Sequence, residues 1–150
     1  MLLAKNLEKE LRDHGSRDYP HECCGALLGT DGGGEDRQVR SLFPLINRRD
    51  DSPRNRFSIT PEDFRAAERA AAERGLDLLG WYHSHPDHPA RPSEFDREHA
   101  WPWYSYVIVS VDAGVAKDLT SWRLEDDRSK FLAEEVGPER AAARQSGADL

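Results

Sequence analysis

The sequence is poor in cysteine, and this scarcity excludes a disulfide-stabilised fold. Only two of the 150 residues are cysteines, the neighbours Cys23 and Cys24. Neighbouring cysteines rarely pair with each other, and two cysteines cannot build a disulfide framework. We therefore expect two reduced thiols in a buried strand, as is usual for a cytoplasmic protein.

An excess of basic charge and long apolar runs are missing as well. The net charge is −7 and the pI is near 5.4, so the basic surface of a nucleic-acid-binding protein is not expected. No apolar run approaches the 18 residues of a membrane span, and no basic stretch followed by an apolar one marks a signal peptide. These absences predict a cytoplasmic protein with neither a nucleic-acid nor a membrane partner.

The apolar residues that are present show helical periodicity in three places. Leucine recurs every four positions over residues 3–11, which predicts an amphipathic helix ending near Gly15. A second helix is expected from Thr60, a suitable N-cap followed by proline, to Gly75. A third, short helix is expected at about residues 94–100.

Short apolar runs between and after these helices predict strands. They cover residues 23–29, 38–47, 56–60, 76–85, 103–111 and 119–125. Pro44 places the second run at a sheet edge or a bulge. The pattern predicts one mixed α/β (α+β) domain over residues 1–125, with a single sheet flanked by helices. Residues 126–150 are expected to form a C-terminal extension, with a short docked helix near Phe131 and then disorder.

The polar residues of greatest interest lie in HSHPDHPARPSEFD, residues 83–96. Side chains alternate along a strand, so His83 and His85 are expected side by side at the end of the fourth run, on the same face as Leu79 and Trp81. Two neutral imidazoles suit Zn²⁺, and a catalytic zinc needs a third protein ligand and one open position.

The third ligand is open to more than one interpretation. Asp96 would lie in the first turn of a helix begun by Ser93, within reach of the histidines. The same S-x-x-D spacing is also a helix-capping pattern. Asp87 and His88 are rival ligands on a proline-rich loop, and His99 lies one turn beyond Asp96. Only the joint spacing H-x-H-P-x₆-S-x₂-D is specific.

That joint spacing resembles the motif of the JAMM (MPN+) zinc metalloproteases, in their small prokaryotic form. The motif consists of a glutamate, a long gap, H-[ST]-H-P and then S-x-x-D, and each position holds the expected residue here. The glutamate is Glu22, in YPHECCGALLG. The similarity extends from about residue 3 to residue 124. The resemblance alone selects Glu22 from the 28 acidic residues.

The resemblance implies a role for each motif residue. His83, His85 and Asp96 would bind one Zn²⁺, Glu22 would act as general base and then as general acid, and Ser93 would donate a hydrogen bond to the oxyanion. Bound zinc lowers the pKa of water from about 15.7 to about 7. The implied fold is a cytidine-deaminase-like sheet flanked by helices. Asp87, His88 and Glu94 are then expected to be bystanders that take no part in metal binding or catalysis.

The resemblance also implies a substrate. It is the amide bond after the C-terminal Gly-Gly of a ubiquitin-like β-grasp protein such as a sulfur carrier. The enzyme itself is expected to be a monomer or a homodimer. Two alternatives stay open: a zinc amidohydrolase or deaminase acting on a small molecule, and a non-catalytic interaction module. The zinc deaminases carry an H-x-E…P-C-x-x-C signature, and no P-C-x-x-C occurs here. No motif residue has been lost, which favours an active enzyme.

Overall fold

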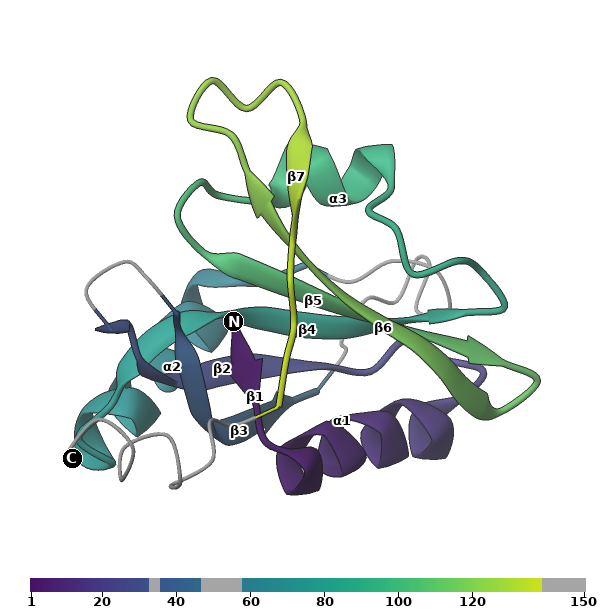
Figure 1. The fold of residues 1–150 in the computed structure, drawn as a ribbon, viewed down its shortest axis with the longest axis horizontal. Coiled ribbons are helices and arrows are strands. Elements are labelled where there is room, and N and C mark those ends of the chain that lie inside the picture. Colours follow the sequence, from purple (N-terminus) through teal and green to yellow (C-terminus); the bar gives the residue numbers. More distant parts are fainter. Residues whose placement is uncertain (33–35, 47–57, 139–150) are drawn as a thin grey trace, which may run out of the picture.

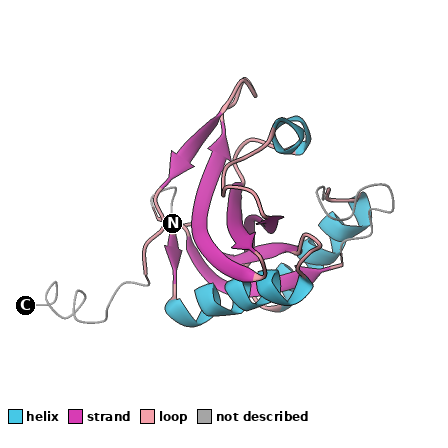
Figure 2. Ribbon diagram, turned by 90° about the vertical axis from the view of Figure 1, so that its right-hand side faces the viewer, coloured by secondary structure: helices cyan, strands magenta, loops and turns pink. Residues whose placement is uncertain are grey.

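A computed structural model describes residues 1–32, 36–46 and 58–138 of the chain. It contains one seven-stranded sheet with helices on both of its faces (Figures 1 and 2). The elements in chain order are β1 (Leu2–Leu3), α1 (Lys5–Asp18), β2 (Cys24–Thr30), β3 (Gln38–Leu45), α2 (Pro61–Glu73), β4 (Asp77–Pro86), α3 (Glu94–His99), β5 (Ser105–Asp112), β6 (Val115–Leu124) and β7 (Phe131–Glu134). The predicted mixed α/β fold is confirmed.

The strand order is β1-β3-β2-β4-β5-β6-β7, which places β4 in the centre of the sheet. β4 runs antiparallel to β2 and parallel to β5, and α3 lies in the connection between the two parallel strands. Strands with neighbours on both sides and helices over both faces are buried almost completely. The carboxyl end of a strand in a parallel pair is a common place for a site, and β4 carries the HSHP residues at this end.

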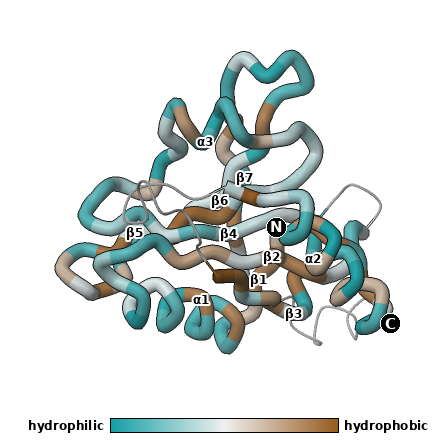
Figure 3. Tube along the Cα trace, turned by 180° about the vertical axis from the view of Figure 1, so that it is seen from behind, coloured by the Kyte–Doolittle hydropathy of each residue, from teal (hydrophilic) through white to brown (hydrophobic). Residues whose placement is uncertain are grey.

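Each face of the sheet has its own hydrophobic core. α1 covers one face, where its Leu7 and Leu11 pack with Tyr82. α2 and α3 lie over the opposite face (Figure 2), where Ala67 of α2 packs with Trp81. Hydrophobic residues follow the middle of the sheet, while the loops are hydrophilic (Figure 3). Within the described ranges no helix is both long and apolar enough to cross a bilayer.

The start of α2 is as predicted. The Thr60 hydroxyl accepts a hydrogen bond from the backbone N–H of Asp63 at 3.0 Å, and the Asp63 carboxylate accepts one from the N–H of Thr60 at 3.1 Å. This reciprocal capping box satisfies two N–H groups that the first turn leaves unpaired. Gly75 follows the helix with φ +68°, a conformation that favours glycine.

The prediction that the first helix ends near Gly15 is wrong, since α1 continues to Asp18. Gly15 is buried inside the helix, and a Cβ there would lie 3.1 Å from a Val111 methyl group of β5. The glycine allows the helix to approach the sheet closely. Leu3, assigned to the same helix by its spacing, lies instead in β1 beside β3.

Two other predicted elements differ from the structure. Residues 58–60 form no strand, and the remainder of the predicted 56–60 strand lies outside the described residues. The helix expected near Phe131 is wrong: this segment is β7, which pairs with β6 in the register Leu124 to Phe131. A four-residue strand can satisfy its backbone groups on β6, and Phe131 packs against the α2-side core.

The prediction that Leu79 shares a face with Trp81 is wrong, because β4 contains a bulge at Leu79. Leu28 of β2 pairs with Leu78 while Leu27 pairs with Gly80, so Leu79 is the extra residue. One inserted residue reverses the alternation of side chains. Leu79 therefore packs in the α1-side core, whereas Trp81 packs on the opposite side with α2.

Candidate metal centre

The end of β4 holds two imidazoles side by side. The Nε2 atoms of His83 and His85 are 3.2 Å apart, and both side chains are buried. Pairing on both sides fixes the strand at this point, with His83 opposite Cys24 of β2 and Ile108 of β5. The strand's alternation thus brings the two rings to one face.

Asp96 reaches the same place from the first turn of α3. Its Oδ1 lies 3.4 Å from Nε2 of His83, and its Oδ2 lies 3.3 Å from Nε2 of His85. Asp96 also completes a capping box: Oδ2 accepts from the Ser93 N–H at 2.8 Å, and the Ser93 hydroxyl accepts from the Asp96 N–H at 3.0 Å. The two interpretations of S-x-x-D are therefore compatible, because the cap orients the carboxylate toward the histidines.

The donor atoms of these side chains lie close enough together to hold one metal ion. Zinc bonds of about 2.0–2.1 Å at tetrahedral angles hold their donor atoms about 3.3–3.4 Å apart, and the two Nε2 atoms are 3.2 Å apart. With one donor atom taken from each residue, the three atoms lie within 4.8 Å of one another. Among the residues that the structure describes, His83, His85 and Asp96 form the one such group of three or more metal-ligating side chains.

The orientation of His85 also suits a metal. Its Nδ1 lies 2.8 Å from the carbonyl oxygen of Pro89. A carbonyl only accepts hydrogen bonds, so Nδ1 carries a proton and Nε2 is the nitrogen that would bind a metal. Nε2 faces the other imidazole and the Asp96 carboxylate.

Asp96 supplies negative charge to this group. Burial by itself would raise the pKa of its carboxyl group. The electrostatic attraction of His83, the hydrogen bonds with His83 and His85, and the Ser93 N–H outweigh burial and hold the pKa well below its usual range. The carboxylate is thus ionised and ready to bind a cation.

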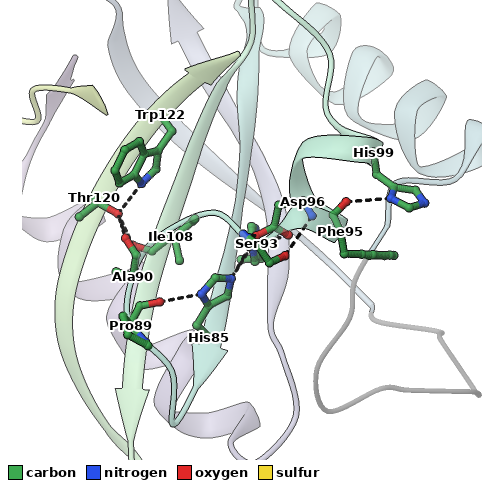
Figure 4. A network of polar contacts seen from close by, with 11 residues as sticks. His85, Pro89, Ala90, Ser93, Phe95, Asp96, His99, Ile108, Thr120 and Trp122 are labelled. Carbon is green, nitrogen blue, oxygen red and sulfur yellow. Dashed lines mark hydrogen bonds and ion pairs between the residues drawn. The ribbon is translucent and has the colours of Figure 1, made fainter. Parts of the chain in front are cut away.

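The loop that supplies the Pro89 carbonyl is itself held by β6 (Figure 4). The Thr120 hydroxyl donates to the carbonyl of buried Ala90 at 2.7 Å and accepts from the indole N–H of Trp122 at 2.8 Å. This chain of contacts fixes the carbonyl that orients the His85 ring. Such outer contacts are part of a working metal site.

The rival ligands do not join the group. Asp87 accepts from the Tyr19 hydroxyl at 2.6 Å and from the Ala113 N–H at 2.9 Å, so it connects the loop to other elements and is more than the bystander that the sequence predicts. His88 is exposed. His99 contacts Phe95, with Nδ1 2.8 Å from its carbonyl oxygen (Figure 4). Glu94 forms an ion pair with Arg97 on the surface.

Glu22 and Ser93 line one cleft with His85. The cleft has a volume of about 550 Å³, and Arg91 also borders it. Glu22 is buried at the end of the segment that precedes β2. The structure therefore brings Glu22 to the same cleft as His85, although 63 positions separate the two residues in the sequence.

The two cysteines next to Glu22 are present as uncharged thiols. Burial raises the pKa of the Cys23 thiol to about 12 and raises that of Cys24 as well. Metal binding requires a thiolate, and both thiols are buried within the sheet. They fit the expected role of small apolar side chains.

Comparisons with known proteins relate this chain to one family. The model of prokaryotic homologs of the JAB domain matches residues 4–125. A desampylase of Haloferax volcanii is 37% identical over 102 residues, which cover 67% of this chain and 70% of that protein. A probable TtuB-protein conjugate cleaving protease of Thermus thermophilus is 34% identical over 112 residues, covering 75% and 71%. A solution structure from Salinibacter ruber is 46% identical with a TM-score of 0.74, covering 92% and 91% of the two chains.

Proposed function

The chain belongs to the family of prokaryotic homologs of the JAB domain, and we propose that it is a zinc-dependent peptidase or isopeptidase. Its substrate is the amide bond after the C-terminal Gly-Gly of a ubiquitin-like β-grasp protein, a class that includes sulfur carriers. The observation that carries the proposal is the group of His83, His85 and Asp96 beside Glu22. The similarity to a desampylase and to a conjugate cleaving protease supports a protein conjugate as the substrate.

Each motif residue has a task that its surroundings support. His83, His85 and Asp96 would hold a zinc ion, which would supply Lewis-acid chemistry at the scissile carbonyl. Glu22 takes a proton from the attacking water and delivers it to the departing amine. The Ser93 hydroxyl accepts from the Asp96 N–H, so its own hydrogen is available to the oxyanion of the tetrahedral intermediate.

A glycine-rich tail suits the cleft beside Glu22. Two glycines have no side chains, so an extended tail can bring its last carbonyl close to the histidines and bind through main-chain hydrogen bonds. The amine that leaves can be a lysine side chain or the next residue of a linear chain. Binding through the tail makes the terminal Gly-Gly the main requirement of the site.

The direct test is mass spectrometry of a cleavage reaction. Zinc-loaded protein is incubated with a β-grasp protein that carries a short extension after Gly-Gly. We expect cleavage immediately after Gly-Gly, and loss of at least about 100-fold in rate for Glu22→Gln, since general acid–base catalysis contributes roughly that much. Glu68→Gln, on the exposed side of α2, is the matched control and should cleave normally.

Other outcomes point to the alternatives. An intact β-grasp protein together with turnover of a small amide would indicate an amidohydrolase. Protein that binds no zinc and cleaves nothing would indicate a non-catalytic module. Full activity of Glu22→Gln would contradict the mechanism while leaving the family unchanged.

A further inference from the structure

The segment that carries Glu22 is attached to the histidine strand on both sides of that residue. After Glu22, the backbone N–H of Cys23 donates to the Ser84 hydroxyl at 2.8 Å, and the Ser84 N–H donates to the Cys23 carbonyl at 3.1 Å. Before Glu22, the Tyr19 hydroxyl donates to the Asp87 carboxylate at 2.6 Å. Ser84 and Asp87 thus flank His85 in sequence, while their partners flank Glu22.

The Ser84 contact continues the sheet beyond its last regular pair. The pairing of β2 with β4 ends at Cys24 opposite His83, and Cys23 lies one residue further. Ser84 is fully buried, on the face opposite the histidines. An alanine there would keep the backbone bond to Cys23 but would remove the acceptor of a buried N–H, which is the costly way to lose a hydrogen bond.

The backbone and the carboxylate of Asp87 are both held by hydrogen bonds to another part of the sheet. Asp87 has φ 58°, in the left-handed region that aspartate tolerates better than most residues. Its N–H donates to the Val111 carbonyl at 2.8 Å, and its Oδ1 accepts from the Ala113 N–H at 2.9 Å. The end of β5 and the turn that follows it therefore hold Asp87, and its Oδ2 accepts from Tyr19.

We propose that Ser84 and Asp87 are positioning residues, which hold the Glu22 carboxylate in register with His83 and His85. The proposal rests on the proposed function, in which Glu22 moves protons beside the metal. Proton transfer requires a base within hydrogen-bond reach, and a displacement of about 1 Å can reduce the rate about 100-fold. The end of β4 and the residue that follows it thus carry the two proposed metal ligands and the supports of the general base.

The test compares variants that remove one hydroxyl each. Ser84→Ala should lower kcat about 10- to 100-fold, and Tyr19→Phe about 3- to 10-fold, with KM within about two-fold of the wild type, because only the alignment of the base changes. Zinc content should stay at the wild-type level in both. Ser84→Thr keeps the hydroxyl and should restore most of the rate.

Ser121→Ala is the matched control for the loss of a buried serine hydroxyl. Ser121 lies in β6 and donates to Glu134 at 2.8 Å. It contacts none of the residues assigned to catalysis, so we expect a similar loss of stability and an unchanged kcat. A decrease of kcat in this control equal to that of Ser84→Ala would mean that general destabilisation explains both.

Hydrogen exchange in the metal-free protein provides a readout apart from activity. The Cys23 amide should exchange faster in Ser84→Ala, while the amides of residues 105–111 in β5 keep their protection, because the lost contact is local. Unchanged exchange at Cys23, or unchanged kcat in both hydroxyl variants, overturns the inference. An inactive wild type with no bound zinc contradicts the proposed function instead. The exchange rate of the Cys23 amide then still shows whether the Ser84 hydroxyl holds the segment that carries Glu22 against β4.

Discussion

Asp96 combines two requirements in one side chain. Its carboxylate caps α3 through the Ser93 N–H and faces both histidines. A cap needs only a hydrogen-bond acceptor, whereas a zinc ligand at this position benefits from a full negative charge. The two requirements can therefore be separated by a substitution that keeps the acceptor and removes the charge.

Asp96→Asn is that substitution. We expect the variant to fold with an unfolding free energy in the metal-free state within about 1 kcal/mol of the wild type, because the amide oxygen can still accept from Ser93. Zinc binding should weaken by at least about 100-fold, since the charged ligand is lost. Metal analysis after gel filtration measures the zinc, and urea unfolding measures the stability. Stoichiometric zinc in Asp96→Asn would remove this residue from the ligand set.

A substitution at Ser93 gives the complementary test, because it removes a hydroxyl and leaves the three proposed zinc ligands in place. Ser93→Ala loses the hydroxyl that accepts from the Asp96 N–H, at a cost of about 1 kcal/mol of stability for the lost cap. It also loses the proposed oxyanion donor, so kcat should fall about 100- to 1000-fold while zinc is retained. Steady-state kinetics together with metal analysis tests this. A variant with normal kcat and only a lower melting temperature would leave Ser93 with the capping role alone.

At the scale of the element, α1 shows how a helix can depend on a titratable residue. His14 is buried under the sheet, with Nδ1 2.9 Å from the Tyr82 hydroxyl and Nε2 3.3 Å from the Asp18 carboxylate. Burial lowers the pKa of this histidine, although the neighbouring Asp18 acts in the opposite direction. The folded protein therefore favours neutral His14.

The stability of the fold should depend on pH through this residue. Because the pKa of His14 is lower in the folded state than its usual value of 6.5, its contribution is fully present above pH 6.5 and is lost as the pH falls below that value. Urea unfolding of metal-free protein between pH 5 and 8 should show this decline. His14→Gln should show a shallower decline over the same range. Equal slopes in the two proteins would contradict the assignment to His14.

The elements that the sequence predicts correctly are those whose signals are local. Thr60 and Pro61 define the start of α2 within four residues, and the β-branched run of β5 needs no distant partner to identify it. Gly15 predicts the end of a helix because glycine often follows the last helical residue, and only the packing against Val111 explains its interior position. The strand at Phe131 likewise depends on β6, which a local pattern does not reveal.

The same distinction applies to the site. The adjacency of His83 and His85 follows from strand alternation, and the approach of Asp96 follows from the cap. Glu22 could not be chosen without the family motif, because the pairing of β2 with β4 brings it near. The contact of Asp87 with Tyr19 had no local signal, since it joins the loop after β4 to the end of α1.

For the whole molecule, protein contacts support the site. The capping box, the Pro89 carbonyl and the central strand β4 all contribute to the placement of the three side chains. This differs from small zinc domains, whose folding depends on the ion because they have little core. Here two hydrophobic cores enclose the sheet, so the metal should add to a fold that already exists.

Removal of zinc should therefore lower stability without unfolding the protein. After dialysis against a chelator, the circular dichroism spectrum should be retained while the melting temperature falls. Zinc at 100 times its dissociation constant should restore about 2.7 kcal/mol, since a ligand that binds only the folded state stabilises it by mass action. At the same zinc concentration Asp96→Asn should gain at most about 0.4 kcal/mol, which distinguishes binding at this site from adventitious binding elsewhere. Loss of the folded spectrum on chelation would instead mean that the ion organises β4 and α3, and that the cap and the loop contacts are its consequence.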